Sequence, residues 1–97
     1  MKRKCQDAVF ERVQRVVANG LNLQAKHVPD SLVLSEFFRD DFDVEELALE
    51  ITDEFEDEEI EVLPEDVYTV MKAKKNLNNG TVGQLADRVQ EILDEAE

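Results

Sequence analysis

The residues with the most reactive side chains in this sequence are one cysteine, Cys5, and one histidine, His27. Nucleophilic catalysis needs a serine or cysteine within reach of a base, and no Ser or Cys spacing around His27 supports such a triad. A lone cysteine cannot form an intramolecular disulfide, which favours a reducing compartment and predicts a cytoplasmic location. We therefore expect His27 to be a loop residue and Cys5 to be a spare thiol.

Carboxylates are the other candidates for chemistry. The run from Asp41 to Glu45 (DFDVE) begins like a calcium-binding loop. The glycine that such a loop needs at its sixth position is replaced by Glu46, and the glutamate at its twelfth position by Thr52. Nothing in the sequence indicates a cleft that would raise the pKa of one carboxyl group for acid catalysis. We therefore predict no metal site and no enzymatic activity.

The negative charge is concentrated in the middle of the chain. The net charge is −13, to which residues 1–29 contribute +4, residues 30–66 contribute −16 and residues 67–97 contribute −1. Such a field repels nucleic-acid phosphates and anionic lipids, and it attracts basic protein surfaces. The expected partners are thus proteins with basic docking patches, with no nucleic acid and no membrane, and a monomer is expected. No apolar run approaches the ~20 residues that span a membrane, and residues 2–4 lack the apolar segment of a signal peptide.

The helices that must position these carboxylates follow from the apolar spacing. Apolar residues recur at helical intervals over residues 9–21, and Asn19-Gly20 is expected to fray or end this first helix. A long loop containing Pro29 follows, with a short helical turn near Phe37. Four apolar side chains should pin this loop onto the core: Leu32, Leu34, Phe37 and Phe38.

A second helix is predicted over Asp43–Phe55, with Asp43 as its N-cap and an apolar stripe opposite an acidic face. Residues 56–59 are all acidic and should be solvated. Pro64 suits the first turn of a third helix, which the lysines of 72–75 would close before a turn at 76–80. The sequence TVGQ, residues 81–84, fits a capping box that opens a last helix reaching Leu93. The prediction is one all-α domain over residues 1–97, with residues 1–7 flexible and no strand.

The segment Asp40–Phe55 resembles the recognition helix of acyl carrier proteins. That family typically has Asp-Ser-Leu-Asp, then Glu-Leu five residues after the serine, then an acidic residue followed by Glu-Phe. The matching positions here are Asp40, Asp43, Glu46, Leu47, Glu54 and Phe55, with Phe42 in place of the leucine. Residues 10–28 and 81–83 resemble the family's first helix with its loop and the start of its last helix. The resemblance implies an acyl-carrier-protein-like four-helix bundle, with three major helices, a short one and a long loop after the first.

The family attaches its 4′-phosphopantetheine arm to the serine, and Asp41 occupies that position. A carboxylate cannot form the phosphodiester that holds the arm, so the cofactor is expected to be absent. Residues 30–32 also read Asp-Ser-Leu, which leaves Ser31 as an alternative attachment site. Its spacing is less suitable, because Leu21 lies nine residues before Asp30 and nineteen before Asp40, whereas the family's loop is close to twenty.

The resemblance further implies that the second helix docks on enzymes of fatty-acid, polyketide or related acyl metabolism. Asp41, Glu45 and Leu49 recur at intervals of four, outside the core stripe, and Leu49 corresponds to an apolar residue that carriers press onto their enzymes. The predicted partner-binding residues are Asp40, Asp41, Glu45, Glu46, Leu49, Glu50, Asp53 and Glu54. Two alternatives stay open: an arm-less interaction or regulatory subunit, and an acidic helical adaptor unrelated to acyl transfer.

Overall fold

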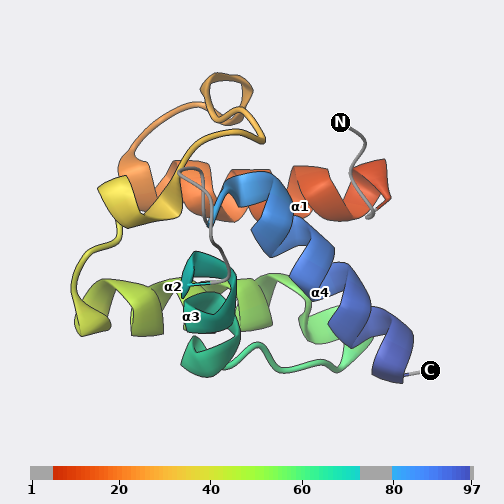
Figure 1. Ribbon diagram of the computed structural model, residues 1–97. Helices are drawn as coiled ribbons and strands as arrows, with labels where there is room; N and C mark the ends of the chain where they lie inside the picture. Colours follow the sequence, from red (N-terminus) through yellow and green to blue (C-terminus); the bar gives the residue numbers. More distant parts are fainter. Residues whose placement is uncertain (1–5, 73–79, 97) are drawn as a thin grey trace.

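The computed structural model describes residues 6–72 and 80–96, and within them every regular element is helical. The helices are α1 (Asp7–Leu21), α2 (Asp41–Glu54), α3 (Pro64–Lys72) and α4 (Val82–Ala96) (Figure 1). Three single turns of 3-10 helix join them: η1 (Ala25–His27), η2 (Leu34–Glu36) and η3 (Glu56–Glu58). The prediction of an all-α bundle with three long helices and a short one is confirmed.

The core is apolar and is built from all four helices together with the loop that precedes α2. The fully buried side chains with the largest volumes are Phe55, Leu34, Leu47, Ile51 and Leu85. Within the described ranges no polar or charged residue is buried. The core stripe predicted for the second helix is confirmed, since Val44, Leu47, Ala48 and Ile51 are all buried.

The long loop is fixed to the start of α4 by backbone hydrogen bonds. The Val82 N–H donates to the Leu32 carbonyl at 3.0 Å, and the Gly83 N–H donates to the Asp30 carbonyl at 2.8 Å. The first N–H groups of a helix have no partner within the helix, so the loop supplies acceptors that α4 lacks. Glycine favours this approach at position 83, because a Cβ there would lie 3.1 Å from the Asp30 Cβ, so the loop would have to shift slightly.

The same end of α4 carries the predicted capping box. The Gln84 N–H donates to Thr81 Oγ1 at 3.2 Å, and Gln84 Oε1 accepts from the Thr81 N–H at 3.1 Å. Gln84 Oε1 also accepts from the Gly80 N–H at 2.8 Å. The prediction from residues 81–84 is therefore confirmed.

The predicted start of the second helix is wrong, and the first helix ends just beyond the predicted Asn19-Gly20. The second helix begins at Asp41 with Asp40 as its N-cap, so Asp43 is the third helical residue. Several acidic residues in succession all suit a helix start, because each is favoured by the dipole, and the pattern cannot choose among them. The first helix runs through Asn19-Gly20 to Leu21 and is closed by Asn22, which takes the left-handed conformation at φ 59°.

Other predictions concern the ends and the connections. Residues 56–59 are exposed, as expected from their charge. The predicted closing lysines after position 72 and the turn up to position 79 lie outside the described residues, as do Cys5 and most of the predicted flexible start.

The segment after η3 is held against α2 by hydrogen bonds to one hydroxyl group, that of Thr52. Thr52 Oγ1 accepts from the Val62 N–H at 2.9 Å and lies 3.1 Å from the Val62 carbonyl oxygen and 3.0 Å from that of Ala48. Val62 and Ile60 are buried beside it. Thr52 therefore joins the irregular segment around Val62 to the helix, where no regular backbone pairing is available.

Replacing this hydroxyl by a methyl group should destabilise the fold. In Thr52→Val the shape is kept, but the Val62 N–H loses its acceptor, so we expect a loss of about 1–2 kcal/mol in the free energy of unfolding. Thr69→Val is the matched control, because the Thr69 hydroxyl bonds only the Glu65 carbonyl of its own exposed helix turn. Urea unfolding followed by circular dichroism measures both variants, and equal small losses would remove the proposed role of Thr52.

Candidate functional site

Helix α2 is the candidate site, and its residues divide among four directions. It contains seven acidic residues and no basic one. A helix turns about 100° per residue, which places Phe42, Glu46, Leu49 and Asp53 opposite the buried stripe. We call this set the outer ridge. Asp43, Glu50 and Glu54 lie on one flank of the helix, and Asp41, Glu45 and Thr52 lie on the other.

The outer ridge combines apolar side chains with carboxylates. Phe42 is 66% exposed and Leu49 is 60% exposed, more than any other large hydrophobic residue in the described ranges. They are seven residues apart, which is about two helical turns, so they lie on the same line along the helix. Glu46 and Asp53, both exposed, accompany them. An exposed apolar pair with a charged surround is the usual composition of a small protein-binding surface.

Phe42 is not among the contact residues predicted from the sequence, where it stands in place of the family's leucine. The signal was present, because a residue seven positions before Leu49 must share its face. The intervals of four that linked Asp41, Glu45 and Leu49 are less exact. Each such step rotates by about 40°, so Asp41 lies on the flank and not on the outer ridge.

On that flank Asp41 bonds to the third helix. The Tyr68 hydroxyl of α3 donates to the Asp41 carboxylate. This hydrogen bond, together with burial and the negative charges of Asp41 and Glu45, raises the pKa of Tyr68 to about 12. Asp41 therefore connects α2 to α3 at the position where the resemblance places the family's serine.

On the opposite flank Glu54 bonds to the first helix. Glu54 Oε2 lies 3.0 Å from Arg12 Nε and 3.1 Å from an Arg15 nitrogen. The Arg12 guanidinium also stacks 4.3 Å from the centre of the Phe55 ring and pairs with Asp57 at 2.8 Å. The hydrogen bond from Arg12 holds the pKa of Asp57 below its ordinary value. Glu54, one of the predicted contact residues, thus has partners within the chain.

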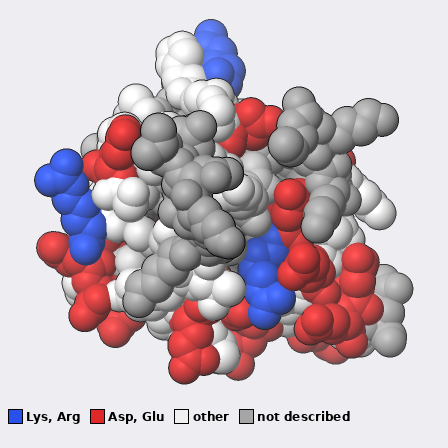
Figure 2. All heavy atoms as spheres, viewed as in Figure 1, with Lys and Arg blue, Asp and Glu red and all other residues white. Residues whose placement is uncertain are grey.

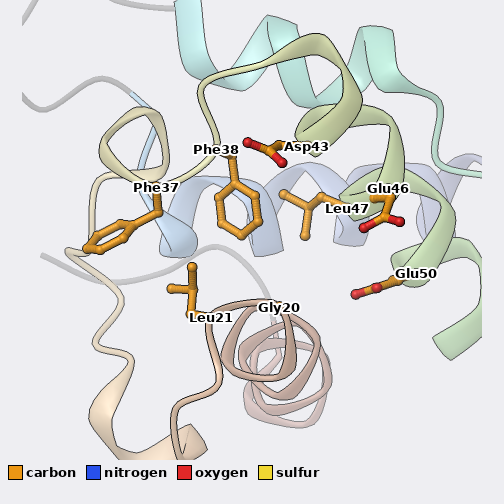
Figure 3. A pocket seen from close by; sticks show the side chains of 8 residues that line it. All are labelled: Gly20, Leu21, Phe37, Phe38, Asp43, Glu46, Leu47 and Glu50. Atoms are coloured by element: carbon orange, nitrogen blue, oxygen red, sulfur yellow. The ribbon is translucent and has the colours of Figure 1, made fainter.

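Between α1, η2 and α2 lies a small hollow of about 80 Å³. Figure 3 shows the side chains of Leu21, Phe38 and Leu47 converging on its centre, with Gly20 at the end of α1 below them. The carboxylates of Asp43, Glu46 and Glu50 line the side of the hollow formed by α2, and Phe37 lies at the edge of the hollow (Figure 3). Two predicted contact residues, Glu46 and Glu50, therefore border a recess.

The remaining candidate for the attachment site, Ser31, lies outside α2, ten residues before its first residue. It is an exposed residue of the turn before η2, next to Asp30, whose carbonyl caps α4. No helix starts at Ser31, whereas Asp40 and Asp41 stand at the start of α2. In residues 6–72 and 80–96 no three His, Cys, Asp or Glu side chains are grouped closely enough to hold a metal ion.

The charge of α2 is visible on the molecular surface. Figure 2 shows Asp and Glu side chains along the lower edge of the molecule, where Figure 1 places α2 and the segment that follows it. Fewer Lys and Arg side chains interrupt this face. The negative charge that the sequence concentrates in its middle third thus lies on the molecular surface.

No protein-family model matches this chain, and neither a curated protein nor a solved structure matches it significantly. None of the described helices is both long enough and apolar enough to cross a membrane.

The single tyrosine of the chain permits a direct test of the α2–α3 bond. We expect the pKa of Tyr68 to be about 12 in the native chain and to fall toward the ordinary 10.0 in Asp41→Asn. Because the folded-state pKa is raised, this contact stabilises the fold fully below pH 10 and its contribution disappears as the pH rises through about 12.

Phenolate absorbance as a function of pH measures the midpoint, with circular dichroism as the check that the chain stays folded. Glu45→Gln is the control and should lower the midpoint less, because the Glu45 charge is the smallest of the contributions. A native midpoint near 10 would contradict the bond between Tyr68 and Asp41.

Proposed function

We propose that this protein is an acyl-carrier-like docking protein without a prosthetic arm. Its outer ridge binds basic patches on enzymes of acyl metabolism, such as fatty-acid or polyketide synthesis, and it performs no catalysis of its own. The cytoplasm is the compartment that this role and the lone cysteine favour.

The outer ridge is the observation that carries the proposal. Phe42 and Leu49 are exposed next to Glu46 and Asp53, and within the described residues neither carboxylate has a hydrogen-bond or ion-pair partner. An apolar pair of this kind supplies the desolvated centre of an interface, and the carboxylates supply a charged rim that guides a basic partner. The order of elements, with a long loop before an acidic helix and a short third helix, agrees with the resemblance.

The absence of an arm follows from the chemistry of Asp41. The arm is held by a phosphodiester, which needs a hydroxyl oxygen, and a carboxylate does not provide one. Asp41 also accepts a hydrogen bond from Tyr68, so it has a structural role at the start of α2. We propose that 4′-phosphopantetheine is absent and that Asp40, Glu45, Glu46, Leu49, Glu50 and Asp53 contact partners with Phe42.

Restoring a serine tests the proposal. Asp41→Ser recreates an Asp-Ser-Phe-Asp start of α2, and we expect a broad phosphopantetheinyl transferase to add one arm to it. The intact mass after co-expression measures the modification. The native chain should keep its mass, and Asp41→Ala serves as the control without a hydroxyl group.

An unmodified Asp41→Ser chain that is folded would count against the carrier-like surface. A native chain that gains an arm would contradict the arm-less proposal, and Ser31→Ala would then show whether Ser31 carries it.

The transferase also tests the role of the charges. In the Asp41→Ser background, adding Glu46→Lys and Asp53→Lys should slow arm transfer about tenfold at low salt, because electrostatic steering raises association rates by at least this factor. The difference should shrink as salt is added. Glu11→Lys with Glu95→Lys is the matched control, since both residues are exposed and lie on other helices. Equal slowing in the two double variants would mean that total charge, and not α2, controls the rate.

A further inference from the structure

The hollow between α1, η2 and α2 is too small for a metabolite and suits a single side chain. Its volume of about 80 Å³ is well below the roughly 300–1,000 Å³ of pockets that enclose small-molecule ligands. Leu21, Phe38 and Leu47 give it an apolar floor, and Figure 3 shows these three side chains converging there. An occupant must therefore be slender and must bring aliphatic surface to the floor.

The rim of the hollow specifies the charge of the occupant. Asp43, Glu46 and Glu50 follow one another at intervals of three and four residues, which makes them neighbours along one side of the helix. Within the described residues none of the three has an ion-pair or hydrogen-bond partner. Like charges at these intervals repel one another, so a cation placed among them relieves repulsion that the free protein retains.

We propose that the hollow receives a lysine side chain of the docked partner protein. The four-carbon stem packs on Leu21, Phe38 and Leu47, and the ammonium group lies among the carboxylates of the rim. A long stem with a charged tip is the form of side chain that covers apolar surface while it keeps its charge near water. An anion would be repelled by the rim, and a purely apolar side chain would leave the three charges unpaired.

This inference rests on the proposed function for the source of the lysine, because the hollow adjoins the outer ridge through Glu46. A partner that presses an apolar residue onto Phe42 and Leu49 would bring a neighbouring lysine over the α1 flank of α2. A lysine in the hollow would fix the orientation of the partner on α2, which contacts to the ridge alone would leave loosely defined.

The test uses n-butylammonium, which has the stem and charge of a lysine side chain, added to the isotope-labelled full chain. Nuclear magnetic resonance should show saturable shifts at the amides around the hollow, and 1-butanol, which lacks the charge, should bind several-fold more weakly. Neutralising the rim in Glu46→Gln with Glu50→Gln should weaken n-butylammonium binding by roughly three- to tenfold. Glu45→Gln with Asp53→Asn makes the same charge change outside the hollow and should leave binding nearly unchanged.

A filling variant separates the hollow from general attraction to a negative protein. A Cβ at Gly20 would meet the Phe38 ring at ordinary contact distances of 3.6 and 3.7 Å. Because Gly20 lines the hollow, we expect the larger side chain of Gly20→Leu to fill it, and the variant keeps every carboxylate. We expect it to abolish the saturable shifts while the rest of the spectrum stays native.

Unaltered shifts in the filled variant, or shifts of equal size around Glu45 and Asp53, would overturn the inference. If n-butylammonium fails while Asp41→Ser still accepts an arm, the hollow alone is refuted. The reverse outcome refutes the carrier-like function and leaves the hollow as a cation-binding recess.

Discussion

Burial of one apolar stripe on α2 is the constraint on which the rest of the structure depends. A helix with seven carboxylates and no basic residue has little intrinsic tendency to pack on anything, and its charges repel one another. Val44, Leu47 and Ile51 are nonetheless at most 2% exposed. Burial of each of these side chains contributes about 1.5–3 kcal/mol to the free energy of unfolding and holds the helix in place. The carboxylates therefore lie on the outer face or on the flanks of the helix.

On the flanks of α2, side chains of the neighbouring helices bond to some of those carboxylates. Toward α1, the guanidinium groups of Arg12 and Arg15 pair with Glu54. Toward α3, Tyr68 donates to Asp41 without adding any charge. The outer ridge and the hollow receive no such compensation from the described residues. Apart from Glu45 on the α3 flank, the uncompensated charge of α2 therefore lies on these two adjoining surfaces.

The features that depend on local periodicity were predictable from the sequence, whereas the features that tertiary contacts determine were not. The apolar stripes, the capping box of Thr81 and Gln84, and the exposure of residues 56–59 follow from spacing and charge alone. The start of α2 did not, because Asp40, Asp41 and Asp43 are equally suitable to local rules. The partners of Glu54 and Asp41 were also beyond reach, because Arg12 and Tyr68 are distant in sequence and meet them only after folding. The exposure of Phe42 was predictable from its interval to Leu49.

The positions of Asp41 and of the outer ridge on different sides of α2 separate two properties that a carrier combines. In the proposed register a carrier's arm would be attached at position 41, on the α3 flank, whereas the proposed docking surface faces away from the bundle. A substitution at position 41 can remove the attachment chemistry and add a bond to Tyr68 without changing Phe42, Glu46, Leu49 or Asp53. The proposed docking surface therefore does not depend on an arm, since the forces that hold the ridge in place come from the buried side of the helix and not from its first turn.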